Sequence, residues 1–131
     1  MTNVSTNNIN TKDYEIAFTE LTTYLVKLKN SNAAFFVNEL LTPTECIMIV
    51  KRFATILMFK NNFSAYRASE VLGLSLSTTH GLYQKYKRGQ YNGLLGNVQK
   101  KDQNRFLSLI EDLIMAQVSP RARARIYNRL L

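Results

Sequence analysis

The sequence has 131 residues, enough for one compact domain, and its 17 Lys and Arg against nine Asp and Glu give a formal net charge of +8. An apolar content of 46%, with seven Tyr and seven Phe, excludes a disordered polycation. No apolar run approaches the roughly 18 residues of a membrane span, and the single cysteine, Cys46, excludes an internal disulfide and an all-cysteine metal site.

The positive charge is concentrated in the second part of the chain. Residues 1–81 carry seven bases and six acids, for +1, whereas residues 82–131 carry ten bases and three acids, for +7. This asymmetry favours an acidic partner for the second part. The N-terminus lacks the apolar core of a secretory signal, so we expect an intracellular protein that binds a polyanion and no membrane.

Residues 1–12 are rich in Asn and Thr and are predicted to form a disordered arm. From Asp13 onward, apolar residues recur at spacings of three and four, which predicts an amphipathic helix. Its apolar stripe consists of Tyr14, Ala17, Phe18, Leu21, Leu25 and Leu28. A break at residues 30–32 is expected to cap a second helix over residues 33–41.

The next helix is predicted from Pro43 to about Lys60. Thr42 can cap its early amides, Pro43 suits the first turn, and Glu45 stands three residues after the cap, as in a capping box. The helix is apolar on most sides and has only a narrow polar wedge, formed by Lys51, Arg52 and Thr55. Such a helix must be surrounded. We expect a second chain in an intertwined homodimer, the alternative being the central helix of a monomeric bundle.

Residues 64–88 have the spacing of a helix-turn-helix motif. A short first helix points Ala68 and Leu72 inward, Gly73 supplies a left-handed turn residue, and a second helix begins near Ser75. One face of the second helix is suited to packing against the core, and it carries Thr79, Leu82, Tyr83 and Tyr86.

The opposite face of the second helix has the pattern of a DNA-reading surface. Its early residues are small or hydrogen-bonding, which allows close approach to base edges, and its late residues are basic, which suits phosphates. The expected base-reading residues are Ser77, Thr78, His80, Gly81 and Gln84, and the expected phosphate contacts are Arg67, Lys85, Lys87 and Arg88. Gln84 can pair bidentately with an adenine. The alternative is a helical hairpin whose polar face meets only water.

These pieces resemble the Trp-repressor-like family. The resemblance covers roughly residues 13–95, and its sharpest parts are Leu41-Thr42-Pro43 followed by Glu45 and the turn at Leu72-Gly73 followed by Ser75. It implies an all-helical, intertwined dimer that places two reading helices about one DNA turn apart.

In the tryptophan-sensing member of that family, one threonine and two arginines hold the corepressor. The threonine and the first arginine match Thr42 and Arg52, but the second arginine aligns with Gly81. We therefore expect no tryptophan effector and no cofactor, and we expect Arg52 to pair with an acid or a phosphate.

A C-terminal extension over residues 96–131 departs from the family pattern. A glycine-containing loop over residues 89–96 is expected to lead into a helix over residues 101–118 and then a basic last helix over residues 121–131. Arg121 and Arg125 lie on one side of that last helix and are candidate phosphate contacts. The alternatives are docking on the partner subunit and, less favoured, attachment to anionic lipid.

Nothing in the sequence indicates an enzyme, because the single histidine and the single cysteine lie on different elements and the acids lack metal-like spacing. The sequence thus predicts an all-α, cytoplasmic, nucleoid-associated homodimer that binds double-stranded DNA and regulates transcription. The alternatives are a low-specificity DNA-packaging or replication accessory factor and a protein–protein adaptor with no nucleic-acid role.

Overall fold

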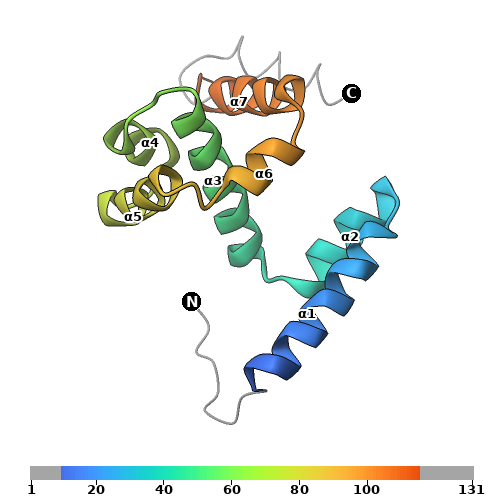
Figure 1. Cartoon of the computed structure of the whole chain (residues 1–131). Helices are drawn as coiled ribbons and strands as arrows, with labels where there is room; N and C mark the ends of the chain where they lie inside the picture. Colours follow the sequence, from blue (N-terminus) through green and yellow to red (C-terminus); the bar gives the residue numbers. More distant parts are fainter. Residues whose placement is uncertain (1–9, 116–131) are drawn as a thin grey trace. The chain divides into compact units, whose positions relative to one another are not determined.

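The computed structural model describes residues 10–115, which contain seven helices and no strand, and the expected all-α class is confirmed for this range. The expected last helix, with Arg121 and Arg125, lies outside the described residues. The helices are shown in Figure 1 and are α1 (Thr11–Val26), α2 (Asn30–Leu40), α3 (Pro43–Lys60), α4 (Ala65–Leu72), α5 (Leu76–Lys87), α6 (Asn92–Asn97) and α7 (Lys100–Met115). The chain divides into two units, residues 1–46 and 47–131, which are described separately.

The start of α1 corrects the expected arm, because residues 11 and 12 are helical. The Asn10 side chain accepts a hydrogen bond of 2.9 Å from the amide of Asp13, which satisfies one of the free amides of the first turn. The helix also ends at Val26, before Leu28. In the sequence, an Asn that caps a helix looks the same as an Asn in a polar tail, because both stand before the first apolar residue. The sequence therefore assigns the start of α1 to the arm.

The second helix also begins earlier than expected. The predicted break at residues 30–32 is wrong, because α2 starts at Asn30 and the break occupies residues 27–29. None of the side chains described in residues 10–46 is buried, although Phe18 and Phe35 are large and apolar. The apolar stripe expected on the first helix is therefore not buried: Leu21 and Leu28 are half-buried, and its other members are exposed.

The bounds of α3 agree with the prediction, and its capping box is present. The Thr42 amide donates to Glu45 Oε1 at 3.1 Å, and the Glu45 amide donates to Thr42 Oγ1 at 3.1 Å. The hydrogen bond from the Thr42 amide to the Glu45 carboxylate, followed by the contribution of the Thr42 side chain, lowers the pKa of the Glu45 carboxyl group.

The second half of α3 is the centre of the unit formed by residues 47–131. Residues 54–59 are all buried, and Thr55 is among them, which corrects its expected place in a polar wedge. Its hydroxyl donates to the Lys51 carbonyl oxygen at 2.8 Å, so no buried donor is left unsatisfied there. By contrast, the residues at 47–50 remain 36–55% exposed although all four are apolar, and they are Ile47, Met48, Ile49 and Val50.

Helices α4 and α5 pack against each other beside the buried half of α3 (Figure 1). Ser64 caps α4 by accepting from the Arg67 amide at 3.0 Å, and Gly73 ends it at φ +65°. Ser75 then caps α5 by accepting from the Thr78 amide at 3.1 Å. The expected left-handed conformation of Gly73 is confirmed.

Helices α6 and α7 complete the unit, and α6 falls where a loop was predicted. Gln103 of α7 is 6% exposed, and its side-chain amide donates to the carbonyl oxygens of Leu95 at 3.1 Å and Val98 at 2.8 Å. Free carbonyls at the end of a helix need such partners. This contact joins α6 to α7, and α7 is in turn joined to α3 by an edge-to-face pair, Phe53 and Phe106, at 4.8 Å.

Among the described residues, no single helix has the length and hydropathy of a membrane span, and only the bent pair of residues 32–40 and Pro43–Lys60 meets that test when the two are taken together.

Candidate nucleic-acid interface

The inner face of α5 anchors this helix to the core, as the periodicity predicts. Thr79 is fully buried and Leu82 is 8% exposed, while Tyr83 and Tyr86 are half-buried. Both tyrosine rings contact the ring of Phe59 from α3, with centroid distances of 5.1 Å and 5.8 Å. The Thr79 hydroxyl donates to the Leu76 carbonyl at 3.0 Å, so its burial leaves no open donor.

The outer face of α5 is open along its whole length. The five expected base-reading residues are all exposed, and they are Ser77, Thr78, His80, Gly81 and Gln84. A β-carbon placed on Gly81 would meet no atom within 4 Å, so the helix backbone can be approached closely there. A duplex groove requires such an open, small-residue surface at the start of a reading helix.

One of these five side chains is held by a local hydrogen bond. The Ser75 hydroxyl donates to Thr78 Oγ1 at 2.7 Å, which fixes the orientation of the Thr78 side chain at the first turn of α5.

The late residues of α5 form the basic end of the same surface. Lys85, Lys87 and Arg88 are exposed, and the Lys87 ammonium group lies 5.5 Å from the centre of the Tyr83 ring, within reach of a cation–π interaction. Residues 71–101 contain five Lys and Arg and no Asp or Glu. No carboxylate within this segment offsets the positive field around α5.

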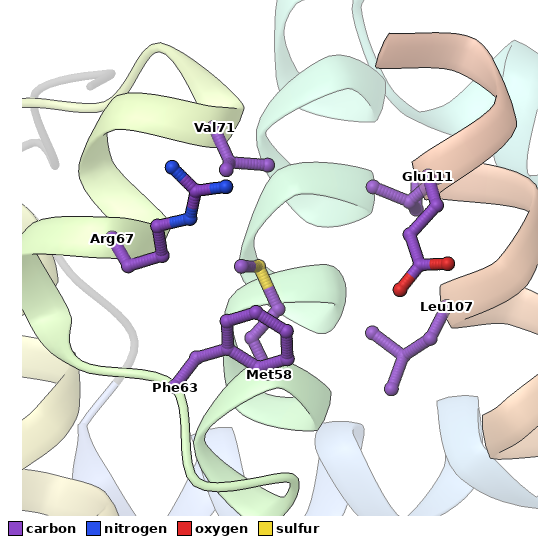
Figure 2. Close-up of a pocket in the computed structure, with 7 residues that line it drawn as sticks. Met58, Phe63, Arg67, Val71, Leu107 and Glu111 are labelled. Atoms are coloured by element: carbon purple, nitrogen blue, oxygen red, sulfur yellow. The ribbon is translucent and has the colours of Figure 1, made fainter. Parts of the chain in front are cut away.

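Arg67, expected at a phosphate, lies beside a pocket that the sequence does not reveal. This pocket has a volume of about 330 Å³ and lies between the end of α3, α4 and α7. Figure 2 shows Arg67 and Glu111 on opposite sides of it, with Met58 and Phe63 between them. Arg67 is exposed and remains able to reach a phosphate, but Glu111 supplies a negative charge nearby that sequence spacing, 44 residues apart, does not predict.

A second hollow, of about 570 Å³, lies beside the basic end of α5. It brings Lys60, the last residue of α3, together with Lys87, and Asn92 of α6 also lines it. Gly89 shapes its floor at φ +77°, where a β-carbon would lie 2.8 Å from Asn92 Nδ2. Lys60 and Asn92 are absent from the predicted phosphate contacts, because no local pattern links them to α5.

Thr42 and Arg52 are the two residues that match the ligand-holding positions of the family that the sequence resembles. The Thr42 hydroxyl accepts in the cap of α3, and Arg52 is exposed. Cys46 is half-buried. Within residues 10–115, no group of three or more His, Cys, Asp or Glu side chains is arranged to hold a metal ion.

Comparisons of the chain with protein-family models, with curated proteins and with solved structures find no match. The candidate interface is therefore argued from its own geometry and charge.

Proposed function

We propose that this protein is a homodimeric transcriptional regulator that binds double-stranded DNA through a helix-turn-helix formed by α4 and α5. The observation that carries the proposal is the difference between the two faces of α5, one packed against the core and one exposed. Its inner face buries Thr79 and Leu82 and packs two tyrosine rings against Phe59 of α3. Its outer face is exposed, with small residues at the start of the helix and basic residues at its end. A groove-reading helix needs both properties, because it must be rigidly held and closely approachable.

In this proposal the roles are divided along the helix. Ser77, Thr78, His80, Gly81 and Gln84 contact base edges, and Lys85, Lys87, Arg88 and Arg67 contact phosphates. The absence of any carboxylate between residues 71 and 101 supports this division, since a DNA duplex repels acidic side chains. The resemblance to the Trp-repressor-like family is consistent with the same arrangement.

The dimer is supported by a different observation. Large apolar side chains are exposed on α1, on α2 and at the start of α3, with Ile16 at 63%, Phe35 at 65% and Ile47 at 55%. Each of these segments exposes apolar surface by itself, and exposed apolar surface of this kind is typical of segments that another chain covers. A two-fold dimer would also present two copies of α5 to two half-sites of one duplex.

The same apolar surface favours the second candidate function, a protein–protein adaptor without a nucleic-acid role. The two candidates differ in their dependence on salt. A DNA-binding protein that neutralises Z phosphates loses affinity with a log–log slope of about −0.9Z, and an adaptor has no such dependence on DNA.

The experiment that tests the proposed function is selection of bound duplexes from a random pool, with affinities measured over a range of salt. We expect two-fold symmetric sites. Gln84→Ala should relax the preference at one base position by about 1–3 kcal/mol if Gln84 pairs with an adenine. Equal losses on selected and random duplex would remove Gln84 from the reading set, and a flat salt dependence of the native protein would favour the adaptor.

A further inference from the structure

The hollow beside the basic end of α5 gathers positive charge from two separate helices. Lys60 ends α3 and Lys87 ends α5, and both are exposed and line the same hollow of about 570 Å³. None of its described lining residues is acidic; the other members are Tyr86, Gly89, Asn92, Leu95 and Gly96. Two lysines therefore line one hollow whose described lining contains no carboxylate, and a bound anion would offset their like charges.

The donors around the hollow fit a phosphate group. Each lysine offers three N–H donors, and the Asn92 side chain offers two more. The backbone fold at Gly89 holds Asn92 at the hollow, since the Asn92 amide donates to the Gly89 carbonyl at 3.2 Å and its side-chain nitrogen lies where a β-carbon on Gly89 would clash. Charge-assisted hydrogen bonds from lysine to phosphate oxygens are among the strong ones.

The Lys87 side chain is also partly oriented before any anion binds. Its ammonium group lies 5.5 Å from the centre of the Tyr83 ring, and Tyr83 is packed edge-on against Phe59 of α3. This contact keeps the Lys87 side chain close to α5, and Lys87 itself lines the hollow.

We propose that Lys60, Lys87 and Asn92 form a phosphate-binding site that takes a backbone phosphodiester group of DNA next to the groove occupied by α5. The identity of the phosphate as part of DNA rests on the proposed function, whereas the site itself rests on the hollow and its charges. It adds Lys60 and Asn92, from two elements outside α4 and α5, to the surface that contacts the duplex.

The test compares two variants of the full chain with a matched control. Lys60→Gln removes one positive charge at the hollow, and Lys27→Gln removes the same charge at an exposed position in the other unit. Asn92→Asp is nearly isosteric and adds a carboxylate to the lining that the two lysines share. It is tolerated at the first residue of α6 because acids suit helix N-termini.

We expect Lys60→Gln to weaken binding to selected and random duplex by the same factor and to reduce the magnitude of the salt slope by about 0.9, the value for one phosphate. Asn92→Asp should weaken binding further while it leaves the thermal unfolding midpoint unchanged or raised. If both variants bind like Lys27→Gln, the site is refuted while the proposed function stands.

A second measurement keeps the site testable without DNA. Sodium phosphate, titrated against sodium chloride at equal ionic strength, should shift the NMR amide signals of Gly89 and Asn92 in the native chain and not in Asn92→Asp. If the native chain binds no duplex but shows this shift, the proposed function fails and the site binds free phosphate. If neither duplex nor phosphate binds, both proposals fail.

Discussion

Ser69 and Leu74 are joined by two hydrogen bonds across the turn between α4 and α5. The Ser69 hydroxyl donates to the Leu74 carbonyl oxygen at 2.7 Å, and the Leu74 amide donates to the Ser69 carbonyl oxygen at 3.2 Å. The amide of Gly73, which lies between them, donates to the same Ser69 carbonyl. Together these bonds fix the direction in which α5 leaves the turn.

The first prediction concerns this pair of hydrogen bonds. Ser69→Ala should lower the free energy of unfolding by about 1 kcal/mol, the net value of one half-buried hydrogen bond. Urea unfolding measures the change. Ser77→Ala is the control, because the exposed Ser77 hydroxyl makes no hydrogen bond within the described residues. Equal unfolding midpoints for the two variants would show that the Ser69 hydroxyl does not hold the turn.

The second prediction concerns Gly73, whose φ of +65° is unfavourable for residues with a β-carbon. Gly73→Ala should lower the free energy of unfolding by about 1–2 kcal/mol. The cost lies in the backbone rather than in crowding, because the nearest atom to an added β-carbon is Lys51 Nζ at 3.8 Å. Gly73→Asn, which tolerates this conformation better, should lose less, and an equal loss in both variants would assign the effect to crowding instead.

The third prediction separates folding from binding at Gly81. Gly81→Ala should raise the free energy of unfolding by about 0.5–1 kcal/mol, because alanine is the better helix former and open space surrounds the position. The same change should weaken DNA binding, since the added methyl group stands on the face that approaches the bases. A more stable variant with unchanged affinity would exclude close approach at Gly81.

The fourth prediction follows from the lowered pKa of Glu45, which hydrogen bonds from Thr42 cause. A carboxyl group with a lower pKa in the folded state stabilises that state at pH values above the ordinary Glu value of 4.5, and this contribution is lost as the pH falls through the folded-state pKa. Glu45→Gln keeps an acceptor for the cap but cannot titrate. The difference in unfolding midpoint between the native protein and Glu45→Gln should therefore change between pH 6 and pH 3, with the native protein losing more. A constant difference would contradict the pKa shift.

The fifth prediction concerns the exposed apolar side chains of α1 and α3. Phe18→Asp or Val50→Asp should convert a dimer into a monomer, because a carboxylate cannot be buried in an apolar interface without a partner. Sedimentation equilibrium gives the mass. Tyr66→Asp is the matched control, since Tyr66 is 66% exposed on α4 and belongs to neither of these apolar segments. A native chain that is already monomeric at all concentrations would remove the dimer from the proposal.

The sequence predicts the parts of the fold that local chemistry determines. The start of α3 follows from Thr42, Pro43 and Glu45, and the inward positions of Ala68, Thr79 and Leu82 follow from helical periodicity. The helix α6 is not predictable in this way, because Gly93 and Gly96 are poor helix formers and indicate a loop. Its C-terminal carbonyls are satisfied by Gln103, a contact from the next helix that no local pattern reveals.

In the candidate site, too, features of a single helix are predictable from the sequence and contacts between helices are not. The outer face of α5 is predictable, since all its residues lie on one element and share one period. Two pairs of residues depend on how separate helices pack. Arg67 and Glu111 line one hollow, and Lys60 and Lys87 line another. No spacing in the sequence predicts these pairs. The amphipathic pattern of α1 is correct as a pattern, but periodicity specifies only which face is apolar and not what covers it.

Helix α3 is one continuous helix of 18 residues. Its residues 54–59 are buried, whereas its residues 47–50 are exposed to solvent. If a second chain covered residues 47–50, it would stabilise the same helix whose other half forms the core. Folding and association would then be a single equilibrium, and the melting temperature would rise with protein concentration.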